Sequence, residues 1–207
     1  MKQKQCLLET KRLTLRRFTE SDVELIFELD NDPDVMCFIN GGIPTPRKII
    51  QDVLLPGFLQ YNSNNTYYGF WAVIEKQTGK FLGWVSFRPT GSDPAELTLG
   101  FRFRKDAWGK GFATEAASAL IHKGFSEMDV QRVIATTYQD NLRSQRVLEK
   151  LGMTLVRKFR LTPEDLKTAD TFFVETDDIW AGEDYEYALE KSEWQQQQAL
   201  GSEWKKI

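Results

Sequence analysis

The sequence has 207 residues, of which 41% are hydrophobic and 28% charged, with a net charge of −3. This length and composition are typical of a single globular domain that buries its own core. The near-neutral charge, without a block of Lys or Arg, argues against a nucleic-acid-binding protein, which needs a clustered basic face.

The N-terminal residues 1–12 lack the apolar segment of a secretory signal. No apolar run in the chain approaches the roughly 20 residues that span a bilayer. We therefore expect a soluble, cytoplasmic protein without a membrane partner. The two cysteines and the single histidine also argue against a disulfide framework and against a classical zinc site.

The first half of the chain is predicted to form one strand, two helices and a hairpin. The strand is Leu13–Arg17, and cap residues at 19–22 begin a helix that runs to Asp30. Prolines and glycines from Pro33 to Pro46 predict an irregular stretch before a second helix, Arg47–Tyr61. Aromatic and β-branched residues then predict a hairpin of Tyr67–Glu75 and Phe81–Arg88.

The second half alternates between strands and helices. The expected elements are a strand Ala95–Phe103, a helix Gly109–Met128, a strand Arg132–Tyr138, a helix Asn141–Leu151 and strands Thr154–Arg160 and Tyr185–Leu189. In the long helix, small and apolar residues recur at the spacing of one buried face, which would allow close packing on a sheet. We expect one domain over residues 1–207, with a core at about 8–194 and a polar tail at 195–207.

The segment between the fourth predicted strand and the long helix is the most informative one. Gly109 and Gly111 allow a tight turn and a close approach of a ligand to the backbone. The helix start adds unpaired N–H groups and a partial positive charge, which suit a phosphate. The pattern does not match a P-loop, because Gly111 rather than Ser or Thr follows Lys110. It does not match the dinucleotide fingerprint either, because Thr114 stands in place of the third glycine.

These motifs resemble those of the GCN5-related N-acetyltransferase (GNAT) superfamily. Residues 108–113 (WGKGFA) are similar to its acetyl-CoA motif, Gln/Arg-x-x-Gly-x-Gly/Ala, with Trp108 in place of the first residue. Asn141–Ser144, followed by Val147–Met153, resembles the second family signature. The start, Leu8–Arg16, and the end, Tyr185–Leu189 with Glu193 and Trp194, resemble the RimJ/RimL-like branch. The resemblance covers about Leu8 to Trp194.

The resemblance implies an α/β (α+β) fold, the GNAT fold. It has a central mixed, mostly antiparallel, twisted sheet of about seven strands flanked by helices, with the cofactor cleft after the fourth strand. It implies an enzyme that moves an acetyl group from acetyl-CoA, without a metal, to a primary amine by direct attack in a ternary complex. The acceptor would be a protein N-terminal α-amine or a small amine, and the chain a monomer or homodimer.

Family members also suggest cofactor contacts for particular residues. The backbone amides that would hold the CoA pyrophosphate belong to Gly109, Lys110, Gly111, Phe112, Ala113 and Thr114. The pantetheine arm would bond the strand at Phe101, Arg102 and Phe103. Trp108 would pack on the cofactor or cover the helix start. Asn141 would contact the pantetheine arm, or it would cap its own helix.

The catalytic candidates are Ser144 and Glu96. Ser144 lies on one helical face with Asn141 and Leu148, at the start of an apolar stripe. Its hydroxyl would protonate the departing thiolate, although it could also be an incidental small residue. Many relatives carry a base where this chain has Thr98. Glu96 lies on the same strand face and either replaces that base or ends the strand in solvent.

Two alternatives to a protein N-terminal acetyltransferase stay open. One is a catalytically inactive acyl-CoA-binding sensor or interaction module, and the other is an enzyme whose acceptor is a polyamine or aminoglycoside. The acidic segment Thr162–Asp184 bears on the acceptor. Its Asp177 and Asp178 would recruit a cationic amine, or the segment would be a solvated loop.

Overall fold

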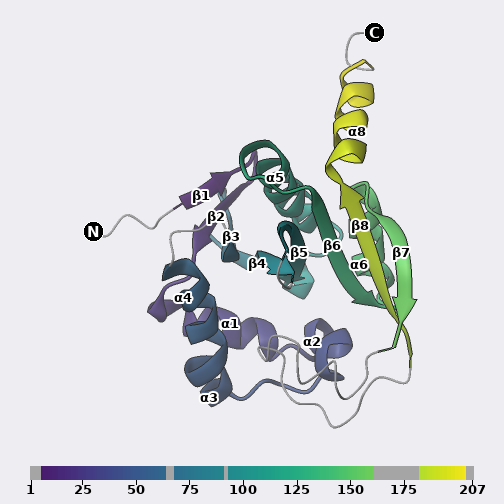
Figure 1. Ribbon diagram of the computed structural model, residues 1–207. Coiled ribbons are helices and arrows are strands. Elements are labelled where there is room, and N and C mark those ends of the chain that lie inside the picture. The colour runs from purple at the N-terminus through teal and green to yellow at the C-terminus, as the bar shows by residue number, and fades with distance from the viewer. Residues whose placement is uncertain (1–5, 64–67, 91–92, 161–181, 204–207) are drawn as a thin grey trace.

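The computed structural model describes residues 6–63, 68–90, 93–160 and 182–203. One eight-stranded sheet forms its centre, in the order β1-β2-β3-β4-β5-β6-β8-β7 (Figure 1). The strands are β1 (Cys6–Glu9), β2 (Leu13–Arg17), β3 (Gly69–Glu75), β4 (Phe81–Thr90), β5 (Asp93–Phe103), β6 (Arg132–Tyr138), β7 (Thr154–Phe159) and β8 (Asp184–Glu190). All neighbours are antiparallel except β5 and β6. The predicted mixed, mostly antiparallel sheet is confirmed, and β1 adds a strand at its edge.

The helices flank this sheet. They are α1 (Val23–Asp30), α2 (Pro33–Asn40), α3 (Arg47–Ile49), α4 (Leu55–Ser63), α5 (Phe112–Glu127), α6 (Leu142–Lys150) and α8 (Lys191–Glu203). Short turns η1 (Glu20–Asp22) and η3 (Lys105–Ala107) and a π-helical turn, η2 (Ile50–Leu54), complete the set. The predicted helix Arg47–Tyr61 corresponds to α3, η2 and α4 together.

Helix α2 lies where the prolines predicted an irregular stretch. Pro33 occupies the first turn of the helix, where its missing N–H costs nothing and its fixed φ is favourable. The side chain of Asp32 caps the helix by accepting a hydrogen bond of 2.9 Å from the amide of Asp34. Gly41, with φ 77°, ends it. The proline therefore begins a helix here, and the prediction of an irregular segment was wrong.

The two faces of the sheet bury two separate hydrophobic cores. On one face, Phe58 of α4 stacks on Phe70 of β3 with ring centroids 3.9 Å apart, beside Trp84 of β4 and Ile26 of α1. The opposite face packs against α5. Gly124 makes this contact close, because a Cβ there would lie 2.5 Å from Cε1 of Phe87 on β4. The predicted close packing of the long helix on the sheet is confirmed.

The C-terminal helix α8 replaces most of the tail predicted at residues 195–207. Its Trp194 packs on Phe125 of α5, with ring centroids 5.5 Å apart. One turn later, Gln197 donates a hydrogen bond of 3.2 Å to the carbonyl of Gly152. Contact with the domain therefore extends beyond the expected limit at residue 194, although α8 is mostly exposed.

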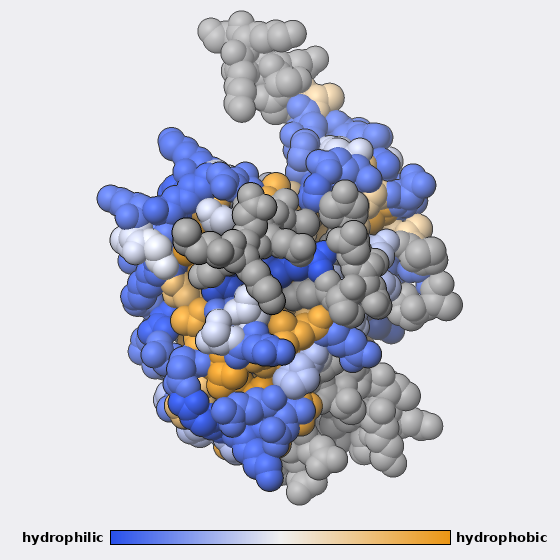
Figure 2. Space-filling view, turned by 90° about the vertical axis from the view of Figure 1, so that its left-hand side faces the viewer, coloured by the Kyte–Doolittle hydropathy of each residue, from blue (hydrophilic) through white to orange (hydrophobic). Residues whose placement is uncertain are grey.

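The surface view shows the side of the molecule that is on the left in Figure 1. Polar side chains dominate its outline, and hydrophobic ones gather in its lower half (Figure 2). Figure 1 places α3 and α4 at this level. Two large hydrophobic residues near these helices, Ile43 and Val53, are 61% and 41% exposed. Within residues 6–63, 68–90, 93–160 and 182–203, no helix has the length and apolar character needed to cross a membrane.

Candidate active site

The edge of β5 is open over its second half. β5 and β6 pair in parallel only at Glu96 with Arg132, Leu97 with Val133 and Thr98 with Ile134. Both strands continue beyond this point, β5 to residue 103 and β6 to residue 138. Among the described residues, they do not pair with each other there. A stretch of β5 next to the predicted phosphate turn can therefore bond a ligand along its backbone.

Two hydrogen bonds show which backbone groups of β5 face this open edge. The amide of Arg104 donates to the carbonyl of Leu82, next to β4, at 2.9 Å. On the other side, the carbonyl of Ala95 accepts from the amide of Gln131, next to β6, at 2.8 Å. Because successive residues of a strand direct their backbone groups to opposite edges, odd-numbered residues from 95 to 103 face β6 and even-numbered ones face β4.

This alternation separates the three residues predicted to bond pantetheine. Phe101 and Phe103 direct their backbone groups to the open edge. The carbonyl of Phe103, however, already accepts a hydrogen bond of 2.8 Å from Nε1 of Trp108. Arg102 faces β4, where it pairs with Trp84. The side chain of Arg102 is buried in an ion pair with Asp30. The geometry thus speaks against Arg102 as a backbone ligand and favours Phe101 with the amide of Phe103.

The turn after β5 presents its backbone to the surface. Gly109 and Gly111 both have left-handed backbone conformations, with φ of 72° and 77°, which favour glycine. A Cβ added at Gly109 would meet no atom within 4 Å. Gly111 is the N-cap of α5, and the first helical bond runs from the amide of Glu115 to its carbonyl. The amides of 112–114 therefore have no partner within the helix, as an anion site requires.

A network from the N-terminal segment holds this turn. Oε1 of Glu115 accepts hydrogen bonds from Oγ1 of Thr10 at 2.6 Å and from the amide of Arg12 at 2.9 Å. Oε2 accepts from Nε of Arg12 at 2.6 Å. Nη1 of Arg12 donates to the carbonyl of Lys110 at 3.0 Å, and the guanidinium lies 4.4 Å from the ring centroid of Phe112. The side chain of Lys110 itself is exposed.

These contacts determine the ionisation of Glu115. Burial alone raises the pKa of a carboxyl group, but here the hydrogen bonds from Thr10 and from the backbone and side chain of Arg12 outweigh it. The pKa of Glu115 is therefore lower than usual, and the carboxylate is charged at neutral pH. The roles of Thr10 and Arg12 could not be predicted from the sequence, because no local pattern links them to a residue more than a hundred positions away.

Trp108 joins the end of β5 to the start of α6. Besides its bond to the Phe103 carbonyl, its ring lies 4.7 Å from Cζ of Arg143, in the first turn of α6. One face of the indole thus contacts a guanidinium of α6, and the two roles expected of Trp108 stay predictions. The same contact brings the first turn of α6, with Ser144, next to the turn that contains Gly109 and Gly111.

Asn141 is the N-cap of α6. Its Oδ1 accepts a hydrogen bond of 3.2 Å from the amide of Ser144, so it has the capping role that was one of its two predicted functions. Both residues are partly buried, and Leu148 on the same helical face is only 1% exposed. The inward orientation of this face follows from the apolar stripe that the sequence shows.

Glu96 lies at the closed end of the β5–β6 pair. Its Oε2 is 3.1 Å from Nε of Arg132, and Nη1 of the same arginine donates to Oε1 of Glu190 at 2.8 Å. The carboxylate is therefore held in an ion pair shared by β5, β6 and β8. An acceptor amine at this position would have to share the carboxylate with Arg132.

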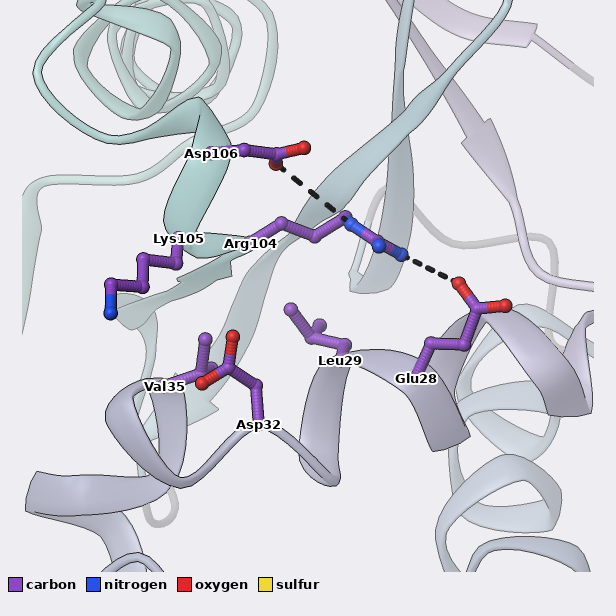
Figure 3. Close-up of a pocket in the computed structure, with 7 residues that line it drawn as sticks. All are labelled: Glu28, Leu29, Asp32, Val35, Arg104, Lys105 and Asp106. Carbon is purple, nitrogen blue, oxygen red and sulfur yellow. Dashed lines mark hydrogen bonds and ion pairs between the residues drawn. The ribbon is translucent and has the colours of Figure 1, made fainter.

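A surface pocket of about 330 Å³ lies beside the segment that precedes the turn. It is lined by Glu28, Leu29, Asp32, Val35, Arg104, Lys105 and Asp106 (Figure 3). Arg104 points between two acids, with Nη1 2.7 Å from Glu28 and Nε 3.9 Å from Asp106. Asp106 also pairs with Lys80, and Lys105 pairs with Asp34. The pocket contains none of the predicted cofactor residues.

The acidic segment with Asp177 and Asp178 lies largely outside the described residues, which omit 161–181. The predicted recruitment of a cationic acceptor by these two residues stays a prediction. In the part of the chain that the structure describes, no group of three or more His, Cys, Asp or Glu residues could hold a metal ion.

Known proteins share this sequence pattern and fold. Residues 12–154 match the family model of the acetyltransferase (GNAT) domain. The chain is 30% identical over 146 residues to the uncharacterized N-acetyltransferase YnaD of Bacillus subtilis (strain 168), which covers 70% of this chain and 81% of YnaD. A GNAT-family acetyltransferase structure from Bacillus anthracis has a TM-score of 0.70 and 26% identity, over 89% of this chain and 98% of that one. The ribosomal L7/L12 α-N-protein acetyltransferase RimL, solved with coenzyme A, has a TM-score of 0.70 at 16% identity, over 90% and 98% of the two chains.

Proposed function

The chain belongs to the GNAT family of acetyltransferases, and on this basis we propose that it transfers the acetyl group of acetyl-CoA to the α-amine of a protein or peptide. The observation that carries this proposal is the open edge of β5, which leads directly into the two-glycine turn at the start of α5. A cofactor with an amide-containing arm and a pyrophosphate matches this order of an extended backbone followed by an anion site.

The residues present fit this cofactor. In our proposal, the backbone of Phe101 and the amide of Phe103 bond the pantetheine arm, as an added strand would. The amides of residues 109–114 hold the pyrophosphate, because the positive φ of both glycines leaves them uncovered. When bound, acetyl-CoA supplies the acetyl group as a thioester. Direct transfer between two bound substrates requires no protein nucleophile.

The side chains of the site then need only to assist proton transfer. The hydroxyl of Ser144 donates a proton to the departing sulfur, from its partly buried place in the first turn of α6. The pKa of an α-amine in a peptide is ordinarily about 7.7–8.0, against about 10.4 for a lysine side chain. An α-amine therefore loses its proton near neutral pH without a strong base. It is the acceptor that best suits a site whose candidate base, Glu96, is paired with Arg132.

The same ion pair favours one alternative. If Glu96 never leaves Arg132 and no other group accepts the proton, the chain would bind acyl-CoA without turning it over. It would then be a sensor or interaction module. Binding of CoA without product formation would distinguish this case from the enzyme.

The test is turnover of acetyl-CoA with a panel of peptides, polyamines and aminoglycosides, with mass spectrometry of the acetylated product. We expect acetylation of peptide α-amines in preference to lysine side chains and small amines. A Gly111→Val variant should lose CoA binding, because it adds a branched side chain at the turn. Gly79→Val is the matched control, since Gly79 has a similar φ of 71° and lies in the β3–β4 hairpin. Failure of wild type to bind CoA in calorimetry would contradict the proposal.

A further inference from the structure

Arg12 contacts three parts of the phosphate turn at once. Nη1 donates to the carbonyl of Lys110 at 3.0 Å, Nε donates to Glu115 at 2.6 Å, and the guanidinium plane lies over Phe112. A Cβ added at Gly111 would lie 3.5 Å from Nη2. One side chain, from the residue just before β2, thus contacts the turn on both sides of the second glycine.

The bond to Lys110 determines the direction in which the next amide points. The described chain contains no cis peptide bond, so the C=O of Lys110 and the N–H of Gly111 point in opposite directions across one rigid peptide plane. Because Arg12 holds the carbonyl, the Gly111 amide is directed away from the guanidinium. We propose that Arg12 is a positioning residue, which holds this peptide so that the Gly111 amide points at the CoA pyrophosphate; this inference rests on the proposed function.

The turn needs such a restraint because glycine reaches many backbone conformations. The peptide that Arg12 holds ends at Gly111. Gly111 occupies the left-handed region, which glycine enters and leaves readily. Without the bond from Arg12, the peptide can rotate and turn its carbonyl toward the pyrophosphate, which repels it. The planar guanidinium makes bonds in two fixed directions, to Glu115 and to Lys110, whereas a lysine ammonium has no such fork.

Arg12 also affects anion binding through its charge, and the experiment must separate this effect from the positioning of the peptide. Glu115 lies in the first turn of α5, near the proposed pyrophosphate site, and its carboxylate would repel phosphate. The ion pair with Arg12 compensates that charge. A loss of affinity in an Arg12 variant could therefore come from a rotated peptide or from an uncompensated Glu115.

The first measurement compares two ligands, CoA and pantetheine, by calorimetry or NMR titration. In Arg12→Ala we expect CoA to bind about tenfold more weakly, the size of one charge-assisted hydrogen bond, and pantetheine, which has no pyrophosphate, to bind as in wild type. Arg12→Lys should recover only part of the affinity. Lys76→Ala is the matched control: among the described residues, Lys76 donates to the Thr10 carbonyl at 2.7 Å and pairs with Glu9, whereas Arg12 bonds the turn itself. Equal weakening of CoA and pantetheine would overturn the proposal.

The second measurement uses the double variant Arg12→Ala/Glu115→Gln. If Arg12 positions the peptide, CoA binding should stay about tenfold weaker than in Glu115→Gln alone. The amide resonance of Gly111 should also shift in Arg12→Ala without ligand. Full recovery of affinity in the double variant would show that Arg12 only compensates charge, and would overturn the proposal. Wild type that does not bind CoA would contradict the proposed function instead.

Discussion

The guanidinium of Arg102 and the carboxylate of Asp30 form a buried ion pair that joins the central strand β5 to helix α1. Nη1 lies 2.6 Å from Oδ1, and the two side chains are only 6% and 2% exposed. Oδ1 nevertheless accepts no well-aligned hydrogen bond from the described residues. The ring of Trp84 covers the arginine, with Cζ 5.3 Å from its centroid. The pair lies on the face of β5 opposite α5.

Asp30→Asn should destabilise the protein by about 3–5 kcal/mol, because it leaves the Arg102 charge buried without its partner. Urea unfolding would measure this change. The double variant Asp30→Leu/Arg102→Met should lose much less stability, since it removes both charges. Glu127→Gln, which breaks the exposed pair with Lys123, should change stability by less than about 1 kcal/mol. A double variant as unstable as Asp30→Asn would contradict this account.

Glu115 should make the protein more stable at neutral than at acidic pH. Its pKa is lowered in the folded state by Thr10 and Arg12. Its stabilising contribution is therefore complete above the ordinary glutamate pKa of about 4.3 and is lost as the pH falls through the lower folded value. The difference in unfolding free energy between wild type and Glu115→Gln should be constant above about pH 5 and shrink below about pH 4.3. A difference that does not depend on pH would contradict the assigned contacts.

Gly124→Ala should destabilise the protein even though alanine favours helices. The added methyl group would lie 2.5 Å from Cε1 of Phe87, and overpacking of this kind costs about 1–3 kcal/mol. That cost exceeds the gain of about 1 kcal/mol in helix propensity. Thermal unfolding would show the net loss. Ser118→Ala, at an exposed position of the same helix, should be neutral or slightly stabilising, and a stabilised Gly124→Ala would show that α5 can move away from β4.

Ser144→Ala should lower kcat by about a hundredfold if its hydroxyl is the general acid. The Kd for acetyl-CoA should change little, because this proton transfer matters mainly in the transition state. Steady-state kinetics and calorimetry on the same preparation would separate the two quantities. A weaker Kd with unchanged kcat would instead make Ser144 a binding residue.

Local features of this fold could be predicted from the sequence, and features that depend on distant segments could not. Gly109 and Gly111 predict the turn, and the small residues of α5 predict its packing, because both signals lie within a few residues. The edge to which a strand residue points depends on register, so the orientation of Arg102 could not be predicted. The contacts of Glu115 with Thr10 and Arg12 arise only when β2 packs beside α5. The role of Pro33 was predicted wrongly, because the sequence around a proline that begins a helix can look the same as that around a proline in an irregular segment.

The short pairing between β5 and β6 has a consequence for the lifetime of the protein in a cell. Three residue pairs join the two parts of the sheet, and a cofactor bonded along β5 would lengthen the ordered region between them. A ligand at a hundred times its Kd adds about 2.7 kcal/mol to the unfolding free energy. For a marginally stable chain, a gain of that size lowers the unfolded fraction on which proteases act by about a hundredfold. At a constant rate of synthesis, we therefore expect cellular levels of the protein to rise and fall with the supply of acetyl-CoA.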